Sequence, residues 1–281
     1  MDIVKTVKDM QERSERIRLS GKKIAFVPTM GFLHEGHLSL LKEGRKRGDD
    51  LVLSIFVNPT QFAPGEDLDA YPKNIERDLA MAEKEGVDAV FLPDATQMYP
   101  DGYQTYVSLE KLPHFLCGLS RPVHFRGVAT VVTKLFNIVK PHVAVFGEKD
   151  FQQLAIIRRM VLDLDMGIDI VGGPIVRETD GLAMSSRNAY LSGTQRQTAL
   201  CLYNALQNAV NLVKNGETDA EAILLSSRTI IESQPETAID YVTLCDPDSL
   251  EIVHTIDKPV LFALAVKVGS TRLIDNMILE P

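Results

Sequence analysis

One stretch near the start of the chain constrains the fold more than any other, because it joins a buried strand to a helix through a glycine-containing turn. Residues 24–27 are an apolar run that ends at Pro28, which is typical of a strand buried on both faces of a parallel sheet. Gly31 and Gly36 allow the backbone to approach a ligand closely, and Leu38 begins the apolar pattern of a helix packed on that sheet. The stretch therefore predicts a strand, a loop and a helix start.

The start of this helix predicts a phosphate site. The N–H groups of a first helical turn, together with the positive end of the helix dipole, attract anions. His34 and His37 are three residues apart, so both imidazoles can lie on one side of a phosphate and donate to its oxygens. For an isolated pair, one capping histidine and one surface histidine is the simpler interpretation. A zinc pair is disfavoured, because helical ligands usually stand four apart and no Cys/His cluster supplies a third.

The composition predicts a soluble globular protein without a large basic surface. The 281 residues are 45% hydrophobic and carry a formal net charge of -8, with a sequence pI of about 5.3. This charge argues against nucleic acid or an anionic membrane as a partner. The N-terminus has no signal-like apolar core and no apolar run approaches membrane-spanning length, so we expect a cytoplasmic protein. The widely spaced Cys117, Cys201 and Cys245 predict buried thiols rather than disulfides or a metal site.

Strand and helix patterns alternate through the first part of the chain. Residues 2–20 predict an amphipathic helix before the first strand. Further buried strands are expected at 51–57, 88–93, 142–146 and 168–171. From Ser192 onwards the pattern changes to two long amphipathic helices followed by three strand-like runs, which suggests a separate small α+β domain. The fold class is therefore α/β with a parallel sheet, followed by this second unit.

Polar side chains follow the second strand, at the edge where open parallel sheets bind ligands. The amide of Gln61 can both donate and accept, which suits a ligand carrying hydroxyl and carboxylate groups, although a loop glutamine is usually solvated. The acidic segment 63–72 is expected to be solvated surface. Asp78, on the helix that begins near residue 74, is a candidate for approach to a magnesium ion, and an exposed helical aspartate is the simpler interpretation.

A second phosphate-binding pattern follows the strand at 142–146. Gly147, Lys149 and a helix start succeed one another, so a cation stands where a helix can bind an anion. The segment lacks the second glycine and the Lys-Ser/Thr pair of a P-loop, which excludes that motif. Gln153 lies one helical turn beyond Lys149 and is placed to face the same cleft as Gln61.

Two further clusters of polar side chains suit phosphate. Arg121, His124 and Arg126 bring positive charge to a helix start, and Arg121 is a candidate contact to the leaving phosphates. The segment 184–187, Met-Ser-Ser-Arg, concentrates two hydroxyls and a guanidinium. Taken alone, each cluster is more simply interpreted as loop residues that make local hydrogen bonds or cap a turn.

Four stretches in this order resemble the pantothenate synthetase (pantoate–beta-alanine ligase) family of the HxGH nucleotidyltransferase superfamily. They are PTMG with HEGH at 28–37, NPTQF at 58–62, GEKDFQQ at 147–153 and MSSRN at 184–188. The resemblance extends over essentially the whole chain. It implies a Rossmann-like parallel-sheet domain over residues 1–176 that binds ATP and pantoate, and a small α+β C-terminal domain over 177–281 that closes over the site. It also implies a cytoplasmic homodimer.

The resemblance implies an ATP-dependent condensation of pantoate with beta-alanine to pantothenate through pantoyl adenylate, with release of pyrophosphate and AMP. Mg²⁺ is expected to neutralise the phosphates, with protein ligands that the sequence does not identify. In this family the second histidine of the motif, here His37, is assigned as the catalytic proton donor. Gln61 and Gln153 are expected to hold pantoate, and Gln61 also to reach beta-alanine.

A larger set of residues is expected to surround the triphosphate, because attack on the alpha-phosphate adds charge to oxygens that are already anionic. The residues expected to act in catalysis are His34, His37, Lys149, Ser185, Ser186 and Arg187. Those expected to hold ATP are Met30, Gly31, Phe32, Leu33, His34, Glu35, Gly36, His37, Gly147, Glu148, Lys149, Asp150, Val176, Met184, Ser185, Ser186 and Arg187.

Three other functions compete with this interpretation. An adenylyl or cytidylyl transferase shares the HxGH turn but leaves the nucleotide on its product, so AMP release that depends on beta-alanine separates the two. A regulatory nucleotide-binding module is disfavoured, because binding alone does not need so many groups around one phosphate. An RNA-charging enzyme is disfavoured by the acidic pI and the small second domain.

Overall fold

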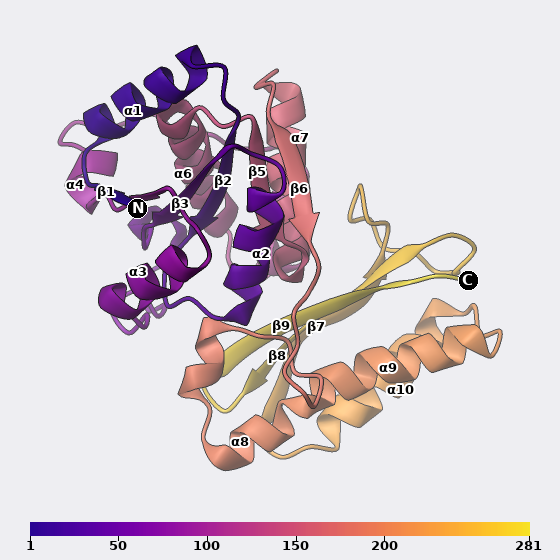
Figure 1. The fold of residues 1–281 in the computed structure, drawn as a ribbon. Coiled ribbons are helices and arrows are strands. Elements are labelled where there is room, and N and C mark those ends of the chain that lie inside the picture. Colours follow the sequence, from indigo (N-terminus) through magenta and orange to yellow (C-terminus); the bar gives the residue numbers. More distant parts are fainter.

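Two sheets of different kinds organise the chain (Figure 1). The computed structural model describes residues 1–281. The first sheet has six parallel strands in the order β1-β4-β3-β2-β5-β6, and the second has three antiparallel strands in the order β7-β8-β9. The strands are β1 (Asp2–Val4), β2 (Ile24–Thr29), β3 (Asp50–Ile55), β4 (Ala89–Phe91), β5 (Val143–Gly147), β6 (Asp169–Gly173), β7 (Thr237–Cys245), β8 (Val260–Val268) and β9 (Thr271–Leu279).

Helices connect and cover these strands. The α-helices are α1 (Val7–Leu19), α2 (Glu35–Arg45), α3 (Ile75–Lys84), α4 (Ala95–Met98), α5 (Cys117–Ser120), α6 (His124–Val139), α7 (Phe151–Asp163), α8 (Gly193–Thr198), α9 (Leu200–Lys214) and α10 (Ala220–Glu232). Four short 3-10 helices are η1 (Pro59–Gln61), η2 (Leu112–His114), η3 (Glu148–Asp150) and η4 (Ser186–Tyr190).

The central strands of the parallel sheet are apolar throughout because helices cover both of their faces. In β2, residues 24–27 are completely buried. On one face Phe26 joins a core formed with α1, α6 and α7, and on the other face Val27 joins a core formed with α2 and α3. The expected strands after the first one are present as β3 to β6, and the parallel α/β architecture is confirmed.

The order of the strands places a crevice beside β2. This strand pairs with β3 on one side and with β5 on the other, so the chain leaves β2 in one direction and later returns to its opposite edge. Ligands bind at such a switch point, outside the carboxyl ends of the strands. The loops that follow β2, β3 and β5 all lie at this edge, and they carry three of the four motif stretches.

The antiparallel sheet packs against both parts of the molecule. In β8, Phe262 and Leu264 point toward the core shared with α9 and α10, whereas Leu261 and Ala263 point the other way and join the core under the parallel sheet. Strand β8 is therefore buried on both faces. This packing explains why its apolar run does not alternate with polar residues.

The expected helix over residues 2–20 is wrong in its first part. Residues Asp2–Val4 form β1, which pairs in parallel with β4, and the helix begins only at Val7 with Thr6 as its cap. The strand is too short to show a period, and its place is decided by backbone hydrogen bonds such as that from Asp2 N to Asp88 O, 2.8 Å long. These partners lie far away in the sequence.

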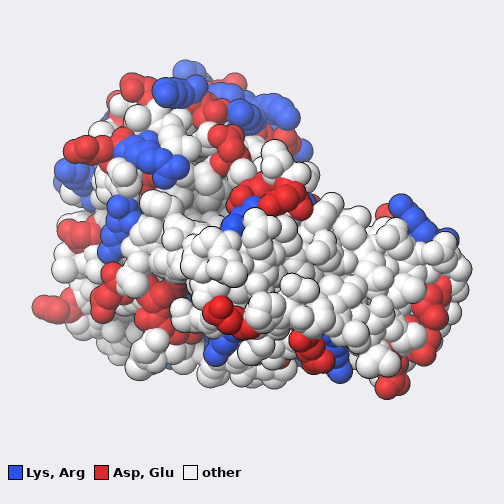
Figure 2. Space-filling model, turned by 90° about the horizontal axis from the view of Figure 1, so that it is seen from below, with Lys and Arg blue, Asp and Glu red and all other residues white.

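No helix combines the length and the apolarity needed to cross a bilayer. The face seen in Figure 2 mixes acidic and basic side chains with a broad uncharged area, and it carries no continuous basic field. Cys117, Cys201 and Cys245 are all buried and free, as expected.

Candidate active site

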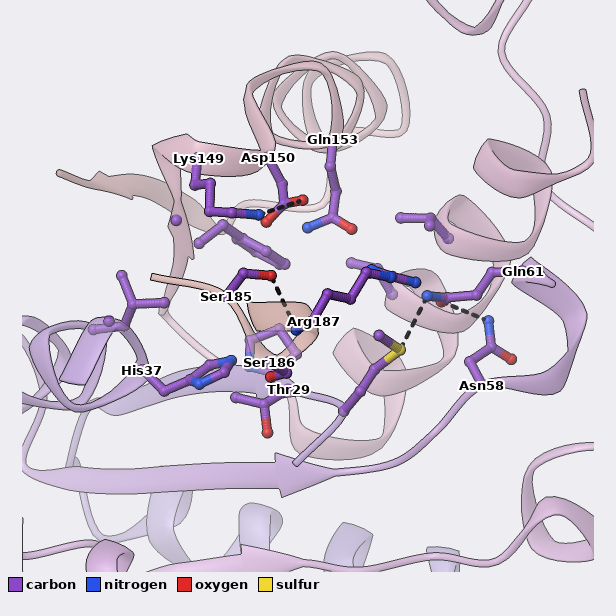
Figure 3. Close-up of a pocket in the computed structure, with 18 of the residues that line it drawn as sticks. Thr29, His37, Asn58, Gln61, Lys149, Asp150, Gln153, Ser185, Ser186 and Arg187 are labelled. Atoms are coloured by element: carbon purple, nitrogen blue, oxygen red, sulfur yellow. Dashed lines mark hydrogen bonds and ion pairs between the residues drawn. The ribbon is translucent and has the colours of Figure 1, made fainter. Parts of the chain in front are cut away.

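A cavity of about 230 Å³ lies at the carboxyl edge of the parallel sheet. Its walls come from the loops after β2, β3 and β5 and from the segment that follows β6. Figure 3 shows these segments facing one another across it. The expected site residues that line it are Met30, His34, Gly36, His37, Gln61, Gly147, Lys149, Asp150, Gln153, Val176, Met184, Ser185, Ser186 and Arg187.

Five of the expected nucleotide-binding residues do not line this cavity. Their side chains or backbone groups point elsewhere: Leu33 is completely buried under the turn and Glu35 is exposed. The five residues are Gly31, Phe32, Leu33, Glu35 and Glu148. They shape the turns that carry the lining side chains instead of forming the wall themselves.

The two motif histidines are held by the first turn of α2. His34 is the helix cap in an extended conformation, and its Nδ1 accepts a hydrogen bond from Gly36 N at 3.2 Å. The Nδ1 of His37 accepts from His34 N at 3.3 Å. A backbone N–H can only donate, so each neutral ring carries its proton on Nε2. His34 therefore both caps the helix and lines the cavity, which joins two interpretations that the sequence left separate.

Both rings are neutral at pH 7. Burial lowers the pKa of His34 to about 4, and the positive charge of Lys149 acts in the same direction. Burial also holds the pKa of His37 well below its ordinary value, with further lowering from His34 and Lys149. The ring centroids are 4.1 Å apart, so two charged rings in this place would repel each other. The pair thus presents N–H donors without carrying charge.

Asp78 braces the turn before these histidines, and the expectation that it is exposed is wrong. Its side chain is completely buried, and its carboxylate accepts from Phe32 N at 2.7 Å and from Leu33 N at 2.8 Å. Gly31 and Phe32 both have positive φ, 85° and 51°, a conformation that costs energy for a residue with a side chain. The carboxylate stabilises this conformation, and both of its oxygens are occupied. The contact joins segments 45 residues apart, which no local pattern predicts.

Lys149 brings its ammonium to the cavity from η3, between β5 and α7 (Figure 3). Its side chain is 19% exposed, and its salt-bridge partner Asp150 is 4.0 Å away, at the limit of an ion pair. Gly147, immediately before η3, forms the end of β5. An ammonium group that is half-buried and has only one distant carboxylate partner favours binding of an anionic ligand.

The Met-Ser-Ser-Arg segment reaches the cavity through η4. Ser185 caps this short helix by accepting from Arg187 N at 3.2 Å, and the Ser186 hydroxyl donates to Phe32 O at 3.3 Å. The capping role that the sequence allowed for a serine is thus present beside the cavity. The bond to Phe32 ties this segment to the turn before α2.

The acidic segment 63–72 is not merely solvated surface, and this expectation is wrong. Asp67 forms two 3.0 Å hydrogen bonds with the Arg187 guanidinium, and Glu66 bonds Arg121 at 2.6 and 2.8 Å. The segment folds back so that its carboxylates pair with two guanidinium groups at the cavity edge. A run of acidic residues shows charge in the sequence, whereas its partners lie more than 50 residues away.

Arg121 and its neighbours divide between two environments. Arg121 and His124 line the cavity, and the His124 Nδ1 lies 3.0 Å from Gln61 O, to which it donates. Burial lowers the pKa of His124 to about 4. Arg126 lies outside, with its guanidinium 3.9 Å from the centre of the Tyr106 ring. The positive cluster expected from the sequence is therefore split.

Gln61 and Gln153 lie along the same cavity (Figure 3). Gln61 is 8% exposed, and its Nε2 lies 3.2 Å from Met30 Sδ. Asn58 is a residue that sequence reasoning did not single out: it is buried, and its Nδ2 donates to Gln61 Oε1 at 3.1 Å and to Gly127 O at 3.2 Å. Its position at the end of a strand, before Pro59, could have identified Asn58 from the sequence as a site residue.

The cavity combines neutral N–H donors, cations and hydroxyls with the amides of Gln61 and Gln153. Such a set can hold a polyphosphate next to a small polar acid and can stabilise charge that develops on phosphorus oxygens. No three or more His, Cys, Asp or Glu side chains are close enough together to hold a metal ion by protein ligands alone.

Comparisons with known proteins agree with this chemistry. The sequence model described as pantoate-beta-alanine ligase matches residues 2–278. The chain is 64% identical to the pantothenate synthetase of Desulfatibacillum aliphaticivorans over 281 residues, which are all of both chains. It is 57% identical to that of Syntrophus aciditrophicus (strain SB), covering 98% of this chain and 96% of the relative.

Solved structures give the same result. The crystal structure of pantothenate synthetase from Thermus thermophilus has a TM-score of 0.96 and 41% identity, with 100% of both chains covered. The pantoate-beta-alanine ligase of Francisella tularensis, crystallised with beta-gamma ATP and beta-alanine, has a TM-score of 0.81 and 32% identity, covering 99% of this chain and 97% of that one.

Proposed function

This chain belongs to the pantoate–beta-alanine ligase family, and from that premise we propose how its own residues carry out the reaction. It is an enzyme that condenses pantoate with beta-alanine to pantothenate at the expense of ATP. In the first step a pantoate carboxylate oxygen attacks the alpha-phosphorus, and the bond to pyrophosphate breaks. In the second step the beta-alanine amine attacks the acyl carbon, loses a proton, and AMP leaves.

The convergence of His34, His37 and Lys149 on one cavity carries the assignment of roles. In our proposal the two Nε2–H groups donate to phosphate oxygens while the rings stay neutral, so His37 acts as a hydrogen-bond donor at the alpha-phosphate. The support is the geometry of the Nδ1 atoms, which accept from the backbone. A fixed donor needs no reorganisation as charge develops in the transition state.

Permanent positive charge comes from two other segments. Lys149 would neutralise the phosphates, with Arg187 supplying a second cation and Ser185 and Ser186 supplying hydroxyl donors. Arg187 must exchange its partner Asp67 for phosphate oxygens in this scheme. The same positions, with Met30, Gly36, Gly147, Asp150, Val176 and Met184 on the cavity wall, would form the ATP site.

Gln61 and Gln153 would bind pantoate, whose hydroxyl and carboxylate groups need both donors and acceptors. Support for this role comes from their common position on the cavity and from the network that holds Gln61 through Asn58 and His124. Gln61 would also reach beta-alanine.

Mg²⁺ would be held mainly by the triphosphate. Magnesium in nucleotide sites usually takes one or two carboxylates and fills the remaining positions with phosphate oxygens and water. Asp150 fits this need, because it lines the cavity and its side chain is half exposed. Asp78 does not fit, since its two oxygens accept backbone N–H groups. When bound, the ion would neutralise charge on the leaving pyrophosphate.

We further propose a division into residues 1–176, which bind ATP and pantoate, and 177–281, which close over the site. The separate core that α9 and α10 form with the antiparallel sheet supports this division. Closure would protect the acyl adenylate from hydrolysis. A cytoplasmic homodimer, the family expectation, is part of the proposal, and light scattering on the purified protein tests its mass.

One experiment tests the proposed order of events. Purified protein is incubated with ATP, Mg²⁺ and pantoate, with and without beta-alanine, and the products are followed by mass spectrometry. We expect pyrophosphate and enzyme-bound pantoyl adenylate without the amine, and AMP with pantothenate only after beta-alanine is added. Release of AMP at the same rate without beta-alanine would contradict the two-step scheme.

A further inference from the structure

A side chain of the C-terminal part of the chain, residues 177–281 and called the small unit below, holds the turn that carries Lys149. Asn276 lies on β9 and is 6% exposed. Its Nδ2 donates to Glu148 O at 3.0 Å and to Lys149 O at 2.9 Å, across more than 120 residues of sequence. A single amide group therefore binds two consecutive carbonyls of η3, which leads from β5 into α7.

This turn has no local side chain to hold it. Neither Gly147, which precedes η3, nor Asp150, which precedes α7, provides a side-chain cap. Most helix starts in this protein do have such a cap, for example Thr6 before α1 and Asn74 before α3. The amide of Asn276 is thus the polar side chain that ties the backbone of η3 from outside its own segment.

Asn276 is itself held in place by its neighbour. Asp275 is 3% exposed and forms two hydrogen bonds with the Arg177 guanidinium, at 2.6 and 2.9 Å. Arg177 also donates to Gly181 O at 3.0 Å and lies 4.8 Å from the centre of the Tyr203 ring. This partly buried ion pair fixes β9 against the segment leading to Met184 and leaves little freedom to the adjoining Asn276.

We propose that Asn276 is a positioning residue for adenylate formation. Through the carbonyls of Glu148 and Lys149 it fixes the turn from which the Lys149 ammonium reaches the triphosphate. The inference rests on the proposed role of Lys149. The small unit would then contribute to catalysis without any closure, because Asn276 on β9 already helps to position the Lys149 ammonium in the cavity. Displacement of a charged group by about 1 Å is enough to lower a rate substantially.

The test uses Asn276→Asp, which keeps the shape of the side chain but has no N–H to donate. A carboxylate oxygen then faces two carbonyl oxygens. We expect pantoate-dependent exchange of pyrophosphate into ATP to fall by about ten- to a hundredfold. The reaction of enzyme-bound adenylate with beta-alanine, measured in a single turnover, should change by less than about threefold, since that step does not need the triphosphate.

Two controls separate positioning from loss of structure. Asn208→Asp adds the same charge to the small unit far from η3, where Asn208 Nδ2 donates to Ser226 Oγ at 2.8 Å, and should leave exchange unchanged. The Ser226 hydroxyl can rotate to donate to the new carboxylate, whereas the two carbonyls that face Asn276 cannot. Asn276→Ala removes the donor without adding charge and serves if the aspartate variant does not fold. It should show the same selective loss in the first step.

A double-mutant cycle decides the matter. Lys149→Ala alone should greatly lower exchange. If Asn276 acts through Lys149, adding Asn276→Asp to that variant should lower the exchange rate by less than about a further twofold, because the effects of coupled residues are not additive. Fully additive losses, or equal losses in both steps, would overturn the inference while leaving the role of Lys149 intact. Unchanged exchange in Lys149→Ala would instead overturn that role, and the inference with it.

Discussion

The imidazoles of His34 and His37 lie with their centroids 4.1 Å apart and their planes tilted by 41°, and each accepts a backbone N–H of the same helical turn through Nδ1. Local structure therefore fixes the tautomer of both rings before any ligand binds. Because each Nε2–H is then free to donate, the helix cap and the proposed phosphate donors are the same side chains. Removing either ring should thus affect the helix start as well as the chemistry.

Replacing His37 by alanine should lower kcat by about a hundredfold or more, as loss of a transition-state donor does in other enzymes. ATP should still bind, because the other proposed phosphate contacts remain. Single-turnover formation of adenylate and calorimetric ATP binding measure the two effects. His254→Ala, at an exposed histidine, is the control and should behave like the wild type. Unchanged turnover in His37→Ala would remove this residue from the mechanism.

The rate of adenylate formation should show no histidine titration between pH 6 and 8, as judged from exchange of pyrophosphate into ATP, which needs no amine. The reason is that the pKa of His34 is lowered to about 4 and that of His37 lies well below its ordinary value. A pH profile with a midpoint near 6.5 that disappears in His34→Ala would contradict this assignment.

Stability should depend on pH through the same two rings. A histidine in the unfolded chain has an ordinary pKa of 6.5, so below that pH the unfolded state binds more protons than the folded one. The contribution of His34 to the free energy of unfolding is therefore fully present above about pH 6.5 and is lost as the pH falls toward its pKa in the folded protein, about 4. Urea unfolding at several pH values should show a smaller loss over this window in His34→Ala than in the wild type.

Asp67→Asn should tighten ATP binding by about two- to fivefold, which corresponds to the free energy of a partly exposed ion pair. Asp67 forms two hydrogen bonds with the Arg187 guanidinium, and a phosphate must replace it there. Asp69→Asn, at an exposed position of the same segment, is the matched control. Weaker ATP binding in Asp67→Asn would mean that this segment contributes to the nucleotide site.

Asp78→Asn should lower the free energy of unfolding by about 1–3 kcal/mol, because one buried backbone N–H loses its acceptor. Adenylate formation should slow as well, since the turn before His34 loses its brace. The Mg²⁺ concentration for half-maximal rate should not change. This result would show that Asp78 stabilises the turn and does not bind the metal ion. Glu76→Gln, at an exposed position of α3, provides the reference. A marked shift in the Mg²⁺ requirement of Asp78→Asn alone would restore it as a ligand.

Gln152 and Gln153 are neighbours in sequence with different expected roles. Gln153→Ala should raise the KM for pantoate by about tenfold, the value of a lost hydrogen bond to a charged ligand, with little change in Tm. Gln152 is buried and bonds Cys117 N, Leu112 O and Phe115 O at 2.7–2.9 Å. Gln152→Ala should therefore lower Tm without a selective effect on pantoate. The reverse pattern would show that the helix register assigns these roles wrongly.

The parallel sheet and the approximate place of the site could be predicted from sequence because both depend on local patterns. Strands buried on two faces require continuous apolar runs, as in residues 24–27, and glycine turns before helices mark the ligand edge. The spacing of His34 and His37 is likewise a property of one helical turn. These patterns, with the family resemblance, were sufficient for the fold and the reaction.

Tertiary structure alone decided which polar groups are partners. Asp67 with Arg187, Asp78 with the turn at residues 32–33, and Asn276 with η3 join segments from 45 to 128 residues apart. The short β1 and the neutral state of the motif histidines also depend on distant neighbours and on burial. Hydrogen bonds and electrostatic interactions act between groups that are close in space. An exposed carboxylate and a buried carboxylate that stabilises a turn therefore cannot be told apart in the sequence, because only the fold determines their surroundings.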